Sequence, residues 1–261
     1  MKVGPYLERI RYDGPQAPTL DTLSALHRAH MLAVPFENLD IHLGIPIALS
    51  VPAFYEKIVT RRRGGYCYEQ NGLFAWLLAE LGFRVWLLSA RVVTSGRLSP
   101  EFDHLLILVE DEERWIADVG FGDSSLDPLR LAGTPAGDDG YAIAADGDGF
   151  TMQRRRDGRV EPEYAFSMTP RTLRDFEPRN AFQQTSPESH FTQKSICSRA
   201  TPTGRITLSG RRLIVTSGGD RVERDVASAA EYGRILVDEF GLKLSQAELD
   251  RLFIRAASAE S

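Results

Sequence analysis

Cysteine is scarce in this chain: only Cys67 and Cys197 occur among its 261 residues, which excludes a disulfide scaffold. No run of about 18 apolar residues is present, so a membrane-spanning helix is not expected. The N-terminal segment has no apolar stretch typical of a secretory signal, which favours a reducing cytoplasm as the location. Basic residues are not in excess: 31 Lys and Arg stand against 36 Asp and Glu. The net charge of −5 argues against nucleic acid or an anionic membrane as the main partner.

Motifs for nucleotide and metal chemistry are missing as well. The glycine pairs at 64–65 and 218–219 lack the lysine and the spacing of a phosphate-binding loop, and no G-x-G-x-x-G occurs. His27 and His30 lie three positions apart, but no third ligand accompanies them at a suitable spacing. The sequence therefore gives no support to nucleotide hydrolysis, hydride transfer or a metal site.

What is present is the composition of an ordinary globular protein with a sizeable core, 43% hydrophobic and 26% charged. Apolar residues recur at helical spacing over about the first 83 residues and alternate from Arg84 onwards. The last part of the chain mixes both patterns. We place the seams near residues 82–83 and near Pro187. The alternating middle part predicts a mainly antiparallel barrel or sandwich.

Individual elements follow from this periodicity and from turn and cap residues. Helices are predicted at residues 20–31, 51–62, 68–81, 169–184, 228–240 and from 245 onwards. Strands are predicted at residues 84–93, 104–110, 114–121, 141–145, 150–155 and 160–167, and then around 191–199, 205–208, 212–216 and 222–226. Thr19 and Ser50 are the expected N-caps of the first two helices. Residues 35–40 are too irregular to be predicted as helix or strand.

Cys67 has the sequence context of a nucleophile. It follows two adjacent glycines in Arg63-Gly64-Gly65-Tyr66-Cys67-Tyr68-Glu69 and opens the helix predicted for residues 68–81. Glycines let the chain approach closely without Cβ clashes. A thiol at a helix N-terminus lies near unpaired N–H groups and the positive end of the macrodipole, which favour the thiolate. Cys197 lies in a strand-like stretch without either feature, and we interpret it as a core residue.

His104 and Asp118 lie near the two ends of a predicted β-hairpin. If Glu110 pairs with Arg114 around a three-residue loop, His104 and Asp118 become diagonal neighbours on one face, with backbones roughly 7–8 Å apart. A two-residue loop would send them to opposite faces of the sheet. Asp118 also interrupts the apolar residues 115–121, where a carboxylate without a partner is costly.

Cysteine, imidazole and carboxylate together predict nucleophilic acyl transfer. Cys67 would attack an activated acyl group as the thiolate, and His104 would take up and return the proton. Asp118 would accept a hydrogen bond from the other ring nitrogen and fix the tautomer. The backbone N–H groups of Cys67 and Tyr68 would stabilise the oxyanion.

The same residues resemble a known family, the arylamine N-acetyltransferases. The matching segments occur in the same order along nearly the whole chain: residues 6–10, 35–40, 63–69, the strand of His104, 118–122 and 197–202. The resemblance implies an α+β protein of three parts: a helical domain with Cys67 at 1–83, an antiparallel β-barrel with His104 and Asp118 at 84–187, and an α/β lid at 188–261. The helical region with its cysteine also resembles the core of papain-like proteases and transglutaminases.

The resemblance further implies the reaction. Acetyl-CoA acylates Cys67, CoA leaves, and the nitrogen of an arylamine, arylhydrazine or hydroxylamine attacks the thioester in a ping-pong sequence that needs no metal. Glu37 and Arg63 match a structural ion pair near the site. Residues that contact CoA are not identified, because the C-terminal part varies within the family. Apolar positions that line the acceptor pocket match three residues here: Phe36, Val92 and Phe121.

Three other interpretations of these residues stay open. An amide synthase that closes macrolactams shares the fold and the triad, and would need a wide, apolar cleft. A cysteine hydrolase has the same triad but admits water to the acyl-enzyme. A non-catalytic binding module with an unreactive Cys67 is the third. The sequence does not indicate the preferred amine, the acyl-chain selectivity or the oligomeric state.

Overall fold

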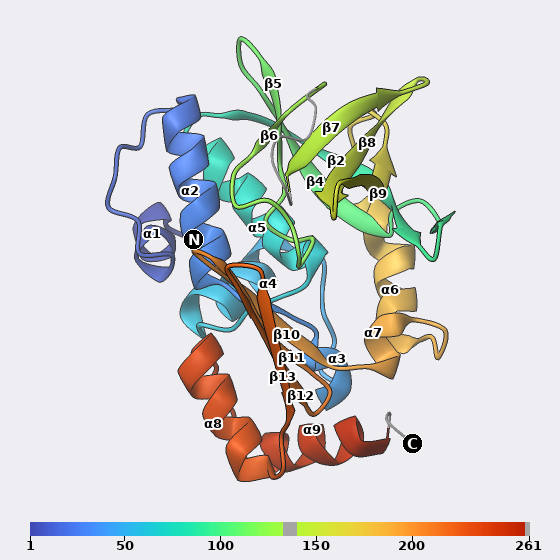
Figure 1. Ribbon diagram of the computed structural model, residues 1–261. Coiled ribbons are helices and arrows are strands. Elements are labelled where there is room, and N and C mark those ends of the chain that lie inside the picture. The colour runs from blue at the N-terminus through green and yellow to red at the C-terminus, as the bar shows by residue number, and fades with distance from the viewer. Residues whose placement is uncertain (133–139, 259–261) are drawn as a thin grey trace.

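The computed structural model describes residues 1–132 and 140–258. Figure 1 shows a helical part, a β-barrel and a C-terminal sheet with two helices, which follow one another along the chain. The predicted α+β fold class with a central barrel is confirmed. Among the described residues, no helix combines the length and the apolarity that a bilayer crossing needs.

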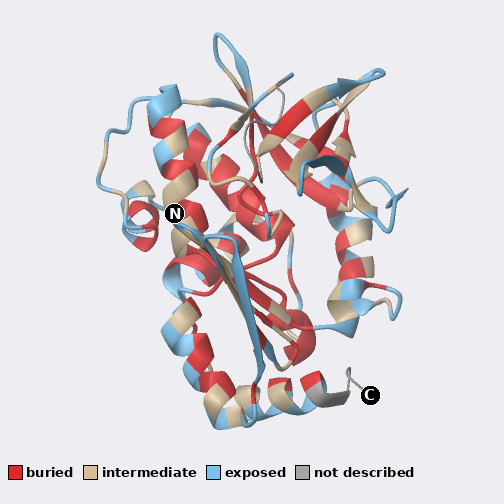
Figure 2. Ribbon diagram, in the orientation of Figure 1, coloured by how far each residue is buried: buried red, intermediate tan, exposed pale blue. Residues whose placement is uncertain are grey.

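The N-terminal part consists of helices packed around the buried helix α5. They are α1 (Val3–Arg9), α2 (Leu20–Ala33), α3 (Leu39–Leu43), α4 (Val51–Tyr55) and α5 (Cys67–Glu80). Thr19 and Ser50 each accept a hydrogen bond from a backbone N–H of the following helix, so both predicted N-caps are confirmed. Figure 2 shows α5 almost wholly buried, and its Leu73 and Phe74 are 0% exposed. The cysteine helix is therefore a core element.

The helix predicted for residues 51–62 is not a uniform α-helix. It is α-helical over α4 and continues as a π-helical turn, η1 (Glu56–Thr60). Such a turn holds about one residue more than an α turn and often occurs at functional sites. Apolar spacing did not reveal it, because one extra residue shifts the pattern only slightly. The turn places Lys57 inside the protein, 3% exposed.

Residues 35–40 are regular, contrary to the sequence prediction. Phe36–Glu37 form β1, which pairs antiparallel with β10 (Ile196–Thr201) of the C-terminal sheet, and Leu39 begins α3. Phe36 also forms a parallel bridge with Gly65, just before Cys67. The prediction failed because a two-residue strand has no period of its own and its partners lie elsewhere in the sequence.

The middle part is an antiparallel sheet that nearly closes into a barrel. Its strands are β2 (Arg84–Thr94), β3 (Arg97–Leu98), β4 (His104–Glu110), β5 (Arg114–Ala117), β6 (Leu129–Arg130), β7 (Tyr141–Asp146), β8 (Gly149–Arg156) and β9 (Arg159–Phe166). The order is β6-β5-β4-β2-β9-β8-β7, with β3 paired to β2. Because β6 and β7, at the two ends of this order, contact each other, the sheet is a barrel rather than a sandwich.

The hairpin of β4 and β5 has the predicted register. Glu110 pairs with Arg114 and Ile107 with Ala117, around the three-residue loop 111–113. β5 ends at Ala117, however, and not at residue 121 as predicted. The strand ends early because Asp118 leaves the ladder and bonds to side chains of other elements.

The C-terminal sheet has the order β1-β10-β11-β12-β13. Its remaining elements are β11 (Gly204–Ser209), β12 (Arg212–Ser217), β13 (Asp220–Asp225), α8 (Ala229–Phe240) and α9 (Gln246–Ser258). Ser245 and Glu248 form the predicted capping box at the start of α9. The sheet includes β1 from the N-terminal part, so it joins chain segments from both sides of the predicted boundary near 187. The division into three domains stays a prediction.

Two predicted elements between the barrel and the C-terminal sheet are displaced. The helix predicted for 169–184 begins later, as the 3₁₀ turn η2 (Leu173–Phe176), and continues as α6 (Glu177–Thr185). The strand predicted around 191–199 begins only at Ile196, because α7 (His190–Gln193) occupies its first part. Thr172 and Ser189 act as the N-caps that the pattern missed.

Candidate active site

Cys67 is the first residue of α5 and lines a large cavity. The backbone N–H of Tyr66, the residue before Cys67, donates a hydrogen bond to the Glu69 carboxylate at 3.1 Å. A hydrogen bond between the N–H of the N-cap residue and the side chain of the third helical residue fixes where a helix begins. Cys67 therefore lies where the sequence placed it, at a helix N-terminus behind two glycines.

His104 and Asp118 are hydrogen-bonded to each other. His104 Nε2 lies 2.8 Å from Asp118 Oδ2, and the two side chains are 3% and 5% exposed. His104 begins β4 and Asp118 directly follows β5, so the odd-length loop between the strands brings them together. Because Nε2 faces the carboxylate, Nδ1 is the ring nitrogen left to exchange a proton with another group.

The turn after Asp118 packs closely onto the cysteine helix. A Cβ atom at Gly120 would lie 2.9 Å from Cys67 Cα and 2.8 Å from Asn71 Nδ2. Any other residue would push the hairpin away from α5. Gly120 thus sets the separation between Cys67 and the hydrogen-bonded pair.

Three further donors hold the Asp118 carboxylate. Asn71 Nδ2 and the Gly120 N–H donate to Oδ1 at 2.8 and 3.1 Å, and the Tyr164 hydroxyl donates to Oδ2 at 2.9 Å. Burial acts to raise the pKa of Asp118, but the imidazole of His104 and the neutral donors hold it below its usual value. Burial also raises the pKa of Tyr164, which keeps its hydroxyl a donor. Asp118 is therefore ionised at neutral pH, with both oxygens bonded.

The thiol of Cys67 differs from the expectation drawn from its helix position. Burial raises the pKa of Cys67, and the carboxylates of Asp103 and Asp118 raise it further. Hydrogen bonds from the backbone of Leu105 and Tyr68 act in the opposite direction without cancelling the effect. The helix N-terminus alone does not make a thiolate here, so a base has to remove the proton.

His27 and His30 have hydrogen-bond partners in the core. His27 accepts a bond from the backbone N–H of Asp118 at 3.2 Å, and His30 lies 2.8 Å from the Tyr6 hydroxyl and 3.1 Å from Gln70 Oε1. Burial lowers the pKa of both rings, that of His30 to about 3. In the part of the chain that the structure describes, no group of three or more His, Cys, Asp or Glu is placed to hold a metal ion.

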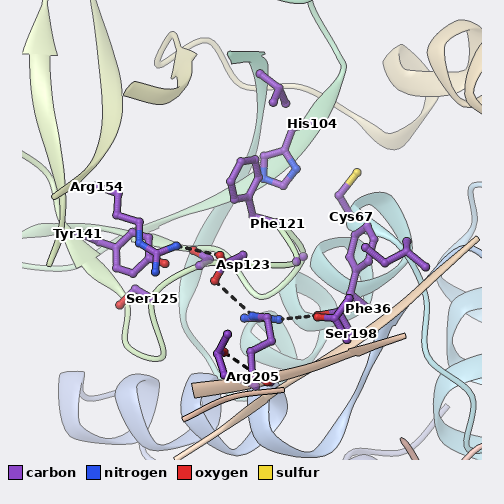
Figure 3. Close-up of a pocket in the computed structure, with 18 of the residues that line it drawn as sticks. Phe36, Cys67, His104, Phe121, Asp123, Ser125, Tyr141, Arg154, Ser198 and Arg205 are labelled. Carbon is purple, nitrogen blue, oxygen red and sulfur yellow. Dashed lines mark hydrogen bonds and ion pairs between the residues drawn. The ribbon is translucent and has the colours of Figure 1, made fainter. Parts of the chain in front are cut away.

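The cavity has a volume of about 1610 Å³ and contains all three predicted pocket residues together with Cys67 and His104. Phe36 comes from β1, Val92 from β2, and Phe121 from the segment after β5. The Phe121 ring packs edge-on against the His104 ring, with 5.1 Å between centroids. Figure 3 shows Phe36 and Phe121 beside Cys67 and His104, and Val92 lines the same cavity.

Further along, the cavity wall is charged (Figure 3). Asp123 lies 2.8 Å from Arg154, 3.2 Å from Arg205 and 3.9 Å from Arg156. We call these four residues the arginine cluster. Two of its arginines lie on β8 and Arg205 lies on β11, so the cluster joins the barrel to the C-terminal sheet.

The sequence pattern did not predict a role for Asn71, Tyr164 or the arginine cluster. Asn71 could have been found, since it lies four residues after Cys67 on the same face of the predicted helix. Tyr164 gave no comparable signal, because it reaches Asp118 only through the pairing of β9 with β2, which places it opposite Val92. Charged residues on strands are usually solvated, so the arginines looked ordinary.

Glu37 and Arg63 form the ion pair that the resemblance implied. Arg63 Nη2 lies 2.8 Å from Glu37 Oε1, and both side chains are buried. Arg63 also contacts Asp40 at 2.9 Å. The pair lies beneath the start of α5 and does not line the cavity.

Comparisons with known proteins identify the family. A family model for N-acetyltransferases matches residues 19–249, so the chain is an acetyltransferase. An arylamine N-acetyltransferase of Mycolicibacterium smegmatis is 39% identical over 255 residues, which cover 94% of this chain and 93% of that protein. One of Escherichia coli is 38% identical over 253 residues, 93% of this chain and 89% of that protein. The structure of the Mycobacterium marinum arylamine N-acetyltransferase in complex with CoA has a TM-score of 0.90 at 35% identity, covering 99% of each chain. The chain belongs to the arylamine N-acetyltransferase family.

Proposed function

We propose that this arylamine N-acetyltransferase carries the acetyl group on Cys67, with His104 moving the proton and Asp118 orienting His104. Acetyl-CoA is the proposed donor, and an arylamine or arylhydrazine is the proposed acceptor. The observation that carries the proposal is the 2.8 Å bond between His104 and Asp118, at the wall of the cavity that also contains Cys67.

In the first half-reaction, His104 Nδ1 takes the proton of the Cys67 thiol, and the sulfur attacks the carbonyl carbon of acetyl-CoA. Asp118 stabilises the imidazolium through the bond to Nε2. The N–H groups of Cys67 and Tyr68, at the start of α5, stabilise the oxyanion. The intermediate then breaks its bond to the CoA sulfur, which leaves with the proton from His104.

In the second half-reaction, the neutral nitrogen of the acceptor attacks the acetyl-Cys67 carbonyl. His104 takes a proton from that nitrogen and returns it to the departing Cys67 sulfur. The apolar side chains of Phe36, Val92 and Phe121 suit the ring of an aromatic amine. They also exclude water, which favours transfer over hydrolysis.

The arginine cluster supports binding of acetyl-CoA at the charged end of the cavity. CoA phosphates are anions that arginine recognises through paired N–H groups. Arg154 and Arg205 both contact the carboxylate of Asp123, and Arg156 contacts Glu163 at 2.9 Å. A phosphate can replace Asp123 as the partner of the first two.

The test is the intact mass of the protein after mixing with acetyl-CoA, and then after addition of aniline. We expect an acetyl increment that persists in buffer and disappears with aniline as the anilide forms. An increment lost equally fast without amine would indicate a hydrolase. No increment would contradict the proposed acetyl carrier.

Two cysteine variants locate the acetyl group. Cys67→Ser should give no stable thioester and no transfer, while its fold stays intact by circular dichroism. Cys197→Ser is the matched control, because Cys197 is a buried thiol outside the cavity, and it should keep the increment. An increment that survives in Cys67→Ser and vanishes in Cys197→Ser would show that Cys197, and not Cys67, carries the acetyl group.

A further inference from the structure

Lys57 is the one buried lysine of the four in the sequence, since the other three are exposed. Its ammonium lies 2.9 and 3.1 Å from the two carboxylate oxygens of Glu69 and 3.0 Å from Asp40 Oδ2. Glu37 Oε1 is further away, at 3.9 Å. A buried ammonium is costly unless such partners surround it. Lys57 lies in the π-helical turn η1.

Lys57 belongs to a closed cluster of charges beneath the start of α5. Five side chains, all 6% exposed or less, form it: Glu37, Asp40, Lys57, Arg63 and Glu69. Arg63 pairs with the first two acids. Lys57 is the cation in contact with Glu69, so the third acid depends on it for compensation.

Glu69 links this cluster to the nucleophile. Its Oε2 accepts the N–H of Tyr66, the residue before Cys67, at 3.1 Å. The side chain also lies directly against Gly65, where an added Cβ would come within 2.8 Å of Glu69 Cβ. The position of the Glu69 carboxylate therefore determines how the chain enters α5 and where Cys67 lies.

We infer that Lys57 is a positioning residue for Cys67: by holding the Glu69 carboxylate on the Tyr66 N–H, it fixes the start of the cysteine helix. This inference rests on the proposed function of Cys67. Lys57 does not line the cavity, so it acts through Glu69 and not on a substrate.

Removal of Lys57 should change how the start of α5 responds to pH. Glu69 faces Lys57 from η1, Glu37 from β1, Asp40 from α3, and Arg63 from the loop before α5. Without Lys57, an ionised Glu69 faces two other carboxylates with Arg63 as the remaining cation of the cluster. As the pH rises, Glu69 then ionises, and repulsion from Glu37 and Asp40 displaces its carboxylate. This displacement disturbs the start of α5.

The experiment compares Lys57→Met, Glu69→Gln and the double variant. The readouts are the rate of Cys67 acetylation by acetyl-CoA and the rate of Cys67 alkylation by iodoacetamide, both followed by peptide mass from about pH 6 to about pH 9. Lys57→Met should acetylate about tenfold to a hundredfold more slowly, since small displacements of a reacting group have effects of that size. Its rates should fall with rising pH, whereas those of the wild type rise.

The double variant should recover most of the lost rate and lose the inverted pH profile, because no carboxyl remains to ionise at that position. A double variant as slow as Lys57→Met, or a single variant that loses thermal stability but keeps the wild-type rates and profile, would overturn the inference. Lys243→Met, which removes an exposed lysine, is the control.

If Lys57→Met does not fold, Glu69→Ala and Glu69→Gln still decide the question. Gln keeps an oxygen that can accept the Tyr66 N–H, and Ala does not. We expect the Ala variant to be at least about tenfold slower than the Gln variant in both reactions. Equal rates would contradict it. Alkylation needs no acetyl-CoA, so a wild type that is alkylated but never acetylated would reject the proposed function without rejecting the role of Lys57.

Discussion

The two ends of the cavity hold their charges in opposite ways. At the inner end, the side chains of His104 and Asp118 are 3% and 5% exposed, and Asp118 accepts bonds from α5, β4 and β9. At the outer end, the Asp123 side chain is 54% exposed and is shared by arginines from two sheets.

This difference corresponds to what each end has to do. A charge in a low-dielectric interior needs partners that do not move, because otherwise its lost hydration is not compensated. At the outer end the Asp123 carboxylate is exposed, whereas Arg154 and Arg205 are 15% and 14% exposed, so a ligand in the cavity can reach these arginines by replacing Asp123. Fixed charges suit proton transfer at His104, and exchangeable ones suit a substrate that leaves in every turnover.

The largest expected effect comes from breaking the inner pair. Asp118→Asn keeps the shape of the side chain but removes the charge that, in the proposed mechanism, stabilises the imidazolium and selects the tautomer. The rate of Cys67 acetylation should fall by about 10⁴-fold, the loss that the same substitution causes in a serine triad. Stopped-flow acylation measures it, with circular dichroism as the check on folding. Near-normal turnover would remove Asp118 from the mechanism.

A smaller loss is expected when only one donor to the inner carboxylate is removed. Tyr164→Phe deletes the hydroxyl that lies 2.9 Å from Asp118 Oδ2 and leaves the ring packing in place. We expect acylation to slow by about tenfold, the effect of one hydrogen bond to a charged group. Tyr55→Phe, whose hydroxyl bonds to the Lys2 carbonyl, is the control. A similar loss in both variants would deny Tyr164 a specific role.

At the outer end, a change should affect binding and not chemistry. Arg205→Gln should raise KM for acetyl-CoA by about tenfold, the range of one charge-assisted contact, and leave kcat almost unchanged. Added salt should weaken donor binding in the wild type more than in the variant. Arg212→Gln on the neighbouring strand β12 lies outside the cavity and should change neither constant. A fall in kcat without a change in KM would contradict the assignment of the cluster to the donor.

The smallest effect is expected on the stability of the fold, through the ionisation of Glu69. Burial raises the pKa of Glu69 from 4.5 to about 7, even with Lys57 beside it. Between these two values the folded state binds more protons than the unfolded state, so the free energy of unfolding falls as the pH rises through this window and levels off above it. The total is on the order of 3 kcal/mol. Urea unfolding at both ends of this pH window measures the free energy of unfolding of the wild type and of Glu69→Gln. The same change with pH in both proteins would contradict the expectation.

The inner end was largely predictable from the sequence, and the outer end was not. The parity of the 111–113 loop places His104 and Asp118 on one face, and the glycines before a helical pattern mark Cys67. Each of these signals is local. The arginine cluster combines residues from three separate segments, and only the packing of the barrel against the C-terminal sheet brings them together.

Other features that the sequence did not predict also depend on contacts between distant segments. β1 is two residues long and exists because β10 and Gly65 pair with it. The helix start was predicted correctly, but burial raises the pKa of Cys67, whereas its position at the helix N-terminus was expected to lower it. Local pattern predicts elements, whereas the environment of a buried group depends on segments that meet only in the folded chain.

The π-helical turn that carries Lys57 makes chain length part of what specifies this site. Successive helical residues are rotated by about 100°, so the deletion of one residue before Lys57 would turn its side chain away from Glu69. The lysine would still be present in the sequence, but its partner would be out of reach. When relatives are aligned with this chain, the number of residues between Ser50 and Cys67 therefore carries as much information as the residue found at position 57.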